Sequence, residues 1–231
     1  VFLASAANKY KVTDFVFVST DKAVEATTLM GKTKRLSELY LQYLNQTTEG
    51  TAFSSVRFGN VMGSSGSVIP KFMTQIREGG PITLSHPEVK RFFMTPSEAA
   101  ALVVQAGVMA RGGEVHILDM GEPIKIQKIA LKMIYLSGLK PKTKEHPDGD
   151  IEIKVVGLQK GEKLDEVLFK GSSLLNTAHK SIFKCQSLTL SLDQLQRLKD
   201  GLGTLEMSVA TKTNDETAKF CLDEILRIVE D

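Results

Sequence analysis

Short runs of apolar and β-branched residues alternate with amphipathic segments along most of this chain. Residues 14–20 form one such run, which is typical of a buried strand, and residues 31–43 repeat apolar side chains at helical spacing. Further strands are expected at residues 51–58, 82–84, 91–94, 114–119 and 151–157, and helices at residues 1–10, 68–78, 96–110, 126–137, 192–199 and 216–229. This alternation indicates an α/β fold with a parallel sheet.

The composition excludes several classes of protein. With 231 residues the chain can form one large domain, or one and a half, around a real core. The net charge of +2 gives no reason to expect nucleic acid or an anionic membrane as a partner, and no apolar run reaches the roughly 18 residues of a membrane span. Two isolated cysteines and four scattered histidines exclude a disulfide scaffold and a cysteine zinc site. We therefore expect a cytoplasmic protein without a bound metal.

A cluster of polar side chains directly follows the first expected strand. Its sequence is Ser19-Thr20-Asp21-Lys22. In open α/β sheets, ligands bind beyond the carboxyl ends of the strands, and a carboxylate beside an amine can supply an acid and a base. On spacing alone, a polar turn that caps the next helix is the favoured interpretation.

Seven ordered blocks of sequence, taken together, resemble one family. They are residues 15–24, 30–35, 56–70, 78–83, 91–95, 117–123 and 161–164. The chain resembles the nucleotide-sugar 4,6-dehydratases of bacterial polysaccharide biosynthesis, a group of extended short-chain dehydrogenases, from about residue 1 to residue 170. The resemblance implies a partial Rossmann-like parallel sheet with a smaller, mixed α/β substrate lobe.

The resemblance also implies a reaction and a cofactor. Such enzymes use NAD to remove water from a UDP-N-acetylhexosamine, here UDP-N-acetylglucosamine, and form a UDP-4-keto-6-deoxy sugar. By the same resemblance, Lys22 is the base at C5 of the sugar and Asp21 is the acid for the departing C6 hydroxyl. A homo-oligomer is expected, and larger members of the family are anchored at the cytoplasmic face of a membrane.

One position departs from the usual short-chain dehydrogenase pattern. Met30 and Lys34 lie four residues apart on one helical face, as the Tyr and Lys of the Tyr-x-x-x-Lys element do. Lys34 resembles the lysine that binds the nicotinamide ribose. Met30 cannot ionise, so it cannot be the base for the C4 hydroxyl, and Thr20 or Ser19 is expected to supply part of that function.

The remaining contacts are carried over from the resemblance. The cofactor is expected at Ser19, Lys34, Phe58 and Gly59, and the substrate at Asn60, Ser67, Lys71, Arg91 and Glu162. Arg91 is the candidate phosphate clamp, since a guanidinium matches phosphate geometry, and the alternative is a strand-edge arginine in an ion pair. Residues 63–67 form either an anion-binding loop or a flexible surface loop.

The glycine-rich turn that cradles a dinucleotide pyrophosphate is absent from all 231 residues. The chain also begins inside an expected helix, so we expect an N-terminal segment to precede it. On this view, residues 1–80 are the later part of an NAD-binding domain, residues 81–180 a UDP-sugar lobe interleaved with the last Rossmann elements, and residues 181–231 a helical extension. The sheet edge at residues 15–19 should then be unpaired.

Two other functions compete with the dehydratase. A nucleotide-sugar C4 epimerase of the same superfamily needs the Tyr that Met30 replaces and does not need the pair of Asp21 and Lys22. A non-catalytic remnant that binds a UDP-sugar without turnover is favoured by the missing glycine turn.

Overall fold

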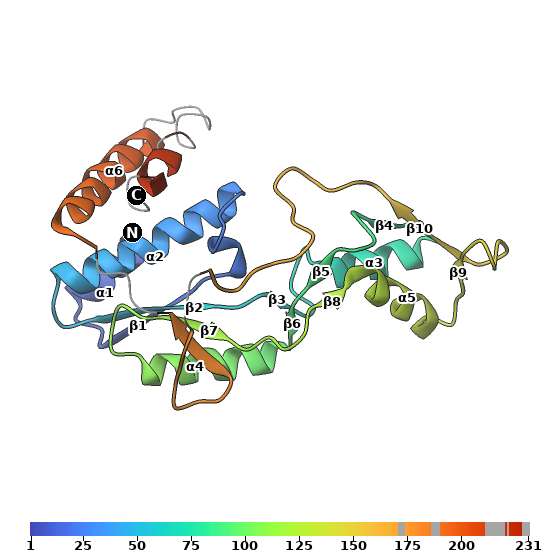
Figure 1. The fold of residues 1–231 in the computed structure, drawn as a ribbon, viewed down its shortest axis with the longest axis horizontal. Coiled ribbons are helices and arrows are strands. Elements are labelled where there is room, and N and C mark those ends of the chain that lie inside the picture. The colour runs from blue at the N-terminus through green and yellow to red at the C-terminus, as the bar shows by residue number, and fades with distance from the viewer. Residues whose placement is uncertain (171–173, 186–189, 211–219, 221, 228–231) are drawn as a thin grey trace. The chain divides into compact units, whose positions relative to one another are not determined.

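The computed structural model describes the chain except for residues 171–173, 186–189, 211–219, 221 and 228–231 (Figure 1). Contacts divide the chain into two compact units. Unit 1 contains residues 1–58, 101–119 and 167–231, and unit 2 contains residues 59–100 and 120–166. The domain boundaries expected at residues 80 and 180 stay a prediction.

Unit 1 is built on a five-stranded sheet. Its strands are β1 (Asp14–Val18), β2 (Ala52–Arg57), β7 (Val115–Leu118), β12 (Ile182–Cys185) and β11 (Leu174–Asn176), in the order β1-β2-β7-β12-β11. The first three strands are parallel, and Val18 lies opposite Val56, so β1 and β2 end at the same edge. β12 pairs antiparallel with β7, and β11 pairs antiparallel with β12.

Helices cover both faces of this sheet. On one side lie α1 (Phe2–Lys9), α2 (Leu29–Thr47) and α6 (Leu192–Ala210), and α4 (Pro96–Met109) lies on the other (Figure 1). Leu36 and Leu39 of α2 pack against Leu198 and Leu202 of α6 in one buried cluster. A second cluster joins α1 and α2 to the fully buried Phe53 of β2. These contacts fix α2 against the sheet.

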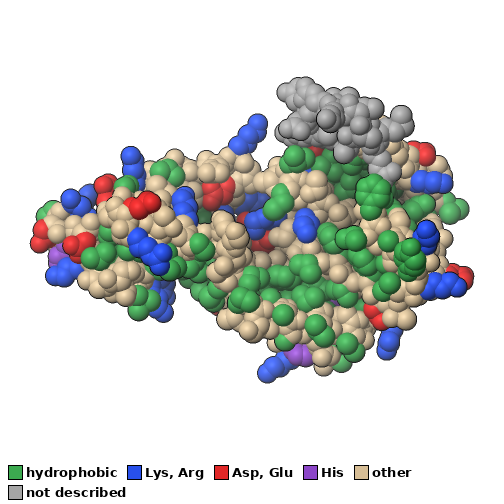
Figure 2. Space-filling view, turned by 180° about the vertical axis from the view of Figure 1, so that it is seen from behind, with side chains coloured by type: hydrophobic (Ala, Val, Ile, Leu, Met, Phe, Trp, Pro, Cys, Tyr) green, Lys and Arg blue, Asp and Glu red, His purple; other side chains and the backbone are tan. Residues whose placement is uncertain are grey.

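β1 is an edge strand of this sheet, as the sequence predicts. Within the described residues its outer side has no strand partner. Several apolar side chains in and before it are exposed, namely Phe2, Leu3, Tyr10, Val12 and Val18. Figure 2 shows hydrophobic side chains gathered over a broad part of the face seen from behind. An open strand edge of this kind is a template for pairing with a further strand.

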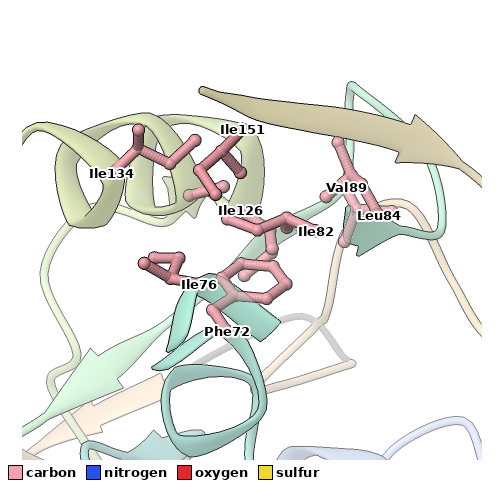
Figure 3. Packing of buried hydrophobic residues seen from close by; sticks show 9 residues of the cluster. Phe72, Ile76, Ile82, Leu84, Val89, Ile126, Ile134 and Ile151 are labelled. Atoms are coloured by element: carbon pink, nitrogen blue, oxygen red, sulfur yellow. The ribbon is translucent and has the colours of Figure 1, made fainter. Parts of the chain in front are cut away.

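Unit 2 is smaller and mixed. It contains α3 (Val68–Arg77), α5 (Ile126–Leu136) and three small sheets. One sheet has the order β4-β10-β9, with β4 at Ile82–Leu84, β10 at Ile151–Val155 and β9 at Pro141–Lys142. A second pairs β3 (Asn60–Val61) with β6 (Phe93–Met94), and a third pairs β5 (Lys90–Arg91) with β8 (Ile124–Lys125). Its core joins Phe72 and Ile76 of α3 to Ile126 and Ile134 of α5, with strand residues such as Ile151 between them (Figure 3).

Most of the expected elements are confirmed, and the α/β fold class with them. Thr95 caps α4 by accepting a hydrogen bond from the amide of Glu98, and Pro96 begins the helix. The strand expected at residues 91–94 is two short strands, because each pairs with a different partner. The antiparallel β11 and β12 were not expected, so the sheet is mixed. Part of the helix expected at residues 216–229 lies outside the described residues.

In the described part of the chain, no helix is both long and apolar enough to cross a membrane.

Replacing Ile134 by alanine should destabilise unit 2. Ile134 is completely buried between α5 and α3, so the substitution leaves a cavity and should lower the free energy of unfolding by about 2–5 kcal/mol. The matched control is Leu136→Ala on the same helix, where the side chain is 78% exposed, and its effect should be within about 0.5 kcal/mol. Chemical denaturation of both variants measures the difference, and equal losses would contradict the assigned core.

His116 should make stability depend on pH. It is buried in β7, and burial lowers the pKa of His116 below its usual 6.5. The unfolded chain then binds the proton more readily, so this contribution to stability is complete above about pH 6.5 and is lost as the pH falls through the folded pKa. The unfolding free energy should therefore fall as the pH drops below about 6.5, and fall less in His116→Gln. The exposed His146, replaced in the same way, is the control, and identical pH profiles for all three proteins would contradict the assignment.

Candidate active site

The polar cluster after β1 forms a short 3₁₀ turn at the carboxyl edge of the sheet. The turn is η1 (Asp21–Ala23), and the hydroxyl of Thr20 caps it by accepting a hydrogen bond of 3.4 Å from the amide of Lys22. The amide of Ser19 donates to the carbonyl of Val56 at 2.8 Å, and the amide of Asp21 donates to the carbonyl of Phe58 at 3.2 Å. The main chain after β1 therefore stays hydrogen-bonded to Val56 and Phe58, which fixes the backbone positions of these polar residues.

Asp21 is the buried centre of this turn. Its side chain is inaccessible to solvent, and its Oδ1 accepts hydrogen bonds from the Thr20 hydroxyl at 2.7 Å and from the Lys22 ammonium at 3.0 Å. Its Oδ2 is also buried and has no hydrogen-bond partner among the described residues. Leaving a buried acceptor unpaired costs about 1–3 kcal/mol, so this oxygen is a point where a donor from a ligand would be stabilising.

Lys34 reaches the same edge from helix α2. Its ammonium donates to the carbonyl of Val18 at 2.9 Å and lies 4.6 Å from the centre of the Phe17 ring. An ammonium has three donors, so this arrangement leaves donors for hydroxyl groups of a ligand. Met30 lies one turn earlier on α2, half exposed, and Thr28 caps the helix there through the amide of Gly31.

Gly31 brings the start of α2 against the turn. A Cβ atom at Gly31 would lie 2.3 Å from the carbonyl oxygen of Lys22, closer than any real side chain approaches. Only glycine therefore permits this contact between helix and turn. The two segments that carry Lys22 and Lys34 are held together by it.

A buried ion pair lies beneath the turn. Glu38 of α2 accepts hydrogen bonds from Nε of Arg57 at 2.7 Å and from its Nη2 at 2.5 Å, and a further one from the Ser19 hydroxyl at 2.6 Å. Arg35 donates to the same carboxylate at 3.3 Å. Burial by itself would raise the pKa of Glu38, but the hydrogen bonds and charge of Arg57, with Ser19 and Arg35, outweigh it and hold that pKa below its usual value.

The pKa values of Arg57 and of the nearby Cys185 are shifted as well. Burial would lower the pKa of Arg57, but the hydrogen bond and charge of Glu38 raise it above its ordinary value. Cys185 of β12 lies near Arg57, and burial raises the pKa of its thiol. Both members of the ion pair are thus held charged, and the thiol is held protonated.

The expected substrate residues lie in unit 2, where the structure anchors several of them. The amide and side-chain nitrogens of Asn60 both donate to the carbonyl of Phe92, at 3.1 and 3.2 Å. A Cβ at Gly59 would lie 2.9 Å from Cβ of Phe92, which explains a glycine before Asn60. Ser67 precedes α3, and its hydroxyl is buried without a partner in the described residues, while Lys71 lies exposed on that helix.

Arg91 is held by acidic side chains, which is the ion-pair alternative of the sequence analysis. Its guanidinium lies 3.3 Å from Oε1 of Glu162 and 3.5 Å from Oε1 of Glu166, and it also donates to the carbonyls of Lys90 and Leu164. Glu162 also accepts from Ser85 at 2.8 Å. The structure thus brings Arg91 and Glu162 together, and phosphate binding by Arg91 stays a prediction.

Comparison with known proteins identifies the family. The family model described as "Polysaccharide biosynthesis protein" matches residues 1–187. The chain belongs to this family. It is 49% identical over 172 residues to the capsular polysaccharide biosynthesis protein CapD of Staphylococcus aureus, a match that covers 74% of this chain and 28% of the relative. It is also 33% identical over 173 residues to the UDP-glucose 4-epimerase of Rickettsia massiliae, covering 74% of this chain and 47% of that one.

Solved structures show the same fold. Pen from Bacillus thuringiensis has a TM-score of 0.69 and 34% identity, with 79% of this chain and 55% of that one covered. At 20% identity and a TM-score of 0.56, the dTDP-glucose 4,6-dehydratase of Bacillus anthracis in complex with NAD matches 68% of this chain and 54% of that one. The chain therefore spans about a quarter of the length of CapD and about half of these structures.

Sequence reasoning found part of the arrangement in this polysaccharide biosynthesis protein. The structure brings Ser19, Thr20, Asp21 and Lys22 together with Lys34 and Phe58 in unit 1. Glu38 and Gly31 were not singled out, although positions 31, 34 and 38 share one helical face. The signal for Glu38 was Arg57, since an arginine inside a buried strand needs a counter-ion. Within the described residues, no cluster of three or more side chains could hold a metal ion.

Replacing Gly31 by alanine should disturb the turn. The new methyl group meets the Lys22 carbonyl, so the free energy of unfolding should fall by about 1–3 kcal/mol. The matched control is Gly203→Ala on α6, where a Cβ meets nothing within 4 Å and should stabilise the helix by up to about 1 kcal/mol. Thermal or chemical denaturation compares the two, and a stabilised Gly31→Ala would show that the contact is not as tight as described.

Proposed function

We propose that the protein is an NAD-dependent nucleotide-sugar 4,6-dehydratase that serves surface polysaccharide synthesis, with UDP-N-acetylglucosamine as its substrate. The observation that carries this proposal is the pair of Asp21 and Lys22. Lys22 donates a hydrogen bond to Oδ1 of Asp21, while Oδ2 of Asp21 is buried without a partner in the described residues. An acid and a base side by side at the carboxyl edge of a sheet suit an elimination of water.

The part of the cofactor assigned to the described residues is its nicotinamide end. Lys34, at the carboxyl end of β1, is proposed to bind the nicotinamide ribose, and Phe58 and Gly59 are proposed as further cofactor contacts. No glycine-rich turn for the pyrophosphate is present in the sequence, so these residues account for the nicotinamide end only. The chemistry that bound NAD would supply there is reversible hydride transfer.

Thr20 and Asp21 provide a route for the proton of the C4 hydroxyl. Met30 cannot accept a proton, whereas the Thr20 hydroxyl already donates to Oδ1 of Asp21 at 2.7 Å. In this proposal, Thr20 takes the C4 hydroxyl proton as it passes its own proton to Asp21. Asp21 then gives that proton to the departing C6 hydroxyl, which leaves as water, and Asp21 is a carboxylate again.

Lys22 is proposed to carry the proton of C5. Lys22 acts in its neutral form: its amine takes the proton from C5 as the C6 oxygen leaves, and the resulting ammonium returns a proton to C5 at the end of the reaction. The net change is the loss of one water, and both side chains end as they began. Asn60, Ser67, Lys71, Arg91 and Glu162 are proposed to hold the UDP-sugar.

The direct test is incubation of the protein, expressed as its gene encodes it, with UDP-N-acetylglucosamine and NAD. Mass spectrometry of the nucleotide sugar should show the loss of one water. A nucleotide sugar that binds but is never altered would instead support a non-catalytic binding protein.

Substitutions in the pair should abolish elimination without abolishing binding. Asp21→Asn keeps the shape of the side chain but removes the acid, and Lys22→Met keeps the stem but removes the base. Each should lower kcat by about 10²–10⁴-fold while the affinity for UDP changes little. The matched control is Lys132→Met on the exposed face of α5, which should keep wild-type turnover. If either variant at Asp21 or Lys22 keeps full turnover, the assigned roles are wrong.

A C4 epimerase is the second candidate, because a relative at 33% identity is named UDP-glucose 4-epimerase. Epimerisation gives a product of unchanged mass, whereas dehydration removes one water. The half-exposed methionine at position 30 argues against the epimerase, because the ionisable hydroxyl used by that chemistry is missing.

A further inference from the structure

Ser19 joins the buried ion pair to the turn that carries Asp21 and Lys22. Its side chain is buried, and its hydroxyl donates to Oε1 of Glu38 at 2.6 Å, the same oxygen that accepts from Nε of Arg57. Its amide donates to Val56 at 2.8 Å. Both the main chain and the side chain of the residue before Thr20 are therefore fixed, one to β2 and the other to α2.

This geometry limits what Ser19 can do for a ligand. A hydroxyl has one proton, and that of Ser19 is given to Glu38, so Ser19 has no proton left to donate to a substrate or cofactor. A carboxylate that is completely buried and holds two arginines as well as this serine has little freedom to move. The bond from Ser19 to Glu38 therefore transmits the position of α2 to the turn.

We propose that Glu38 is a positioning residue that acts through Ser19 to hold Asp21 and Lys22 in register with Lys34. This rests on the proposed function, because Asp21, Lys22 and Lys34 are its reacting and cofactor-binding groups. Arg57 keeps Glu38 charged and in place, and Gly31 allows α2 to approach the turn closely enough for the bond to form. Loss of the serine hydroxyl should loosen the turn while the ion pair remains.

The test begins with Ser19→Ala, with Ser37→Ala as its matched control. Ser37 lies on the same helix as Glu38, and its hydroxyl donates to the carbonyl of Thr33 within that helix, away from the turn. In Ser19→Ala, kcat should fall by about ten- to a hundredfold, because a small misplacement of reacting groups is costly, while KM values change less than about twofold. Ser37→Ala should keep the wild-type values, and Ser19→Thr, which keeps a hydroxyl, should restore part of kcat.

A double-mutant cycle separates this role from simple stability. Glu38→Ala, which removes the acceptor of the Ser19 hydroxyl, should lower kcat, and adding Ser19→Ala to it should lower kcat little further, because the bond from Ser19 is already lost. Independent, multiplying effects on kcat would overturn the proposal. A raised KM for NAD with an unchanged kcat in Ser19→Ala would also overturn it, since Ser19 would then contact the cofactor directly.

Hydrogen exchange tests the same link without any activity. The amides of residues 20–24 should exchange faster in Ser19→Ala than in the wild type and in Ser37→Ala. Unchanged exchange would overturn the positioning role, even if the enzyme proves to be a dehydratase. Faster exchange in a protein that never dehydrates a nucleotide sugar would support the link and reject the proposed function, so the two failures are distinguishable.

Discussion

The arrangement of unit 1 depends on a carboxylate in its interior. Glu38 reaches from α2 to Arg57 on β2 and to Ser19 at the end of β1, so one side chain joins a helix and two neighbouring strands. Breaking such a pair by removing one partner typically costs about 3–5 kcal/mol, because the other charge stays buried. The segments joined by Glu38 are also the ones that carry Asp21, Lys22 and Lys34.

The elements that the sequence predicts well are those whose pattern is local. The helix now seen as α5 and the strand now seen as β1 show clear periodicity, and both are confirmed. β11 and β12 could not be predicted, because they are short and gain their stability from pairing in the sheet next to β7. β12 pairs with β7, which lies more than 50 residues earlier in the chain, and β11 in turn pairs with β12, so no local pattern records either strand.

The residues of the candidate site also differ in how far the sequence alone reveals them. Asp21 and Lys22 are recognisable from their types and their place after a strand, whereas Lys34 stood out only through the family resemblance of the sequence. Glu38 could be found only by asking which side chain neutralises Arg57, a question of long-range contact. The partners of Arg91 were equally invisible, because Glu162 lies 71 residues further along the chain.

Two buried carboxylates in unit 1 differ in the bonds around them, and this difference matches the roles proposed for them. Glu38 has both oxygens filled by donors, and its pKa is held low, so it stays an anion and serves as an anchor. Asp21 is just as buried, yet within the described residues one of its oxygens lacks a donor, and the other is bonded to groups that can exchange protons. When the environments of two carboxylates differ this much, one can serve as an anchor and the other as a reactive acid. Under the proposed function, Glu38 with its full set of bonds is the anchor, and Asp21, whose Oδ2 lacks a donor in the described residues, is the acid.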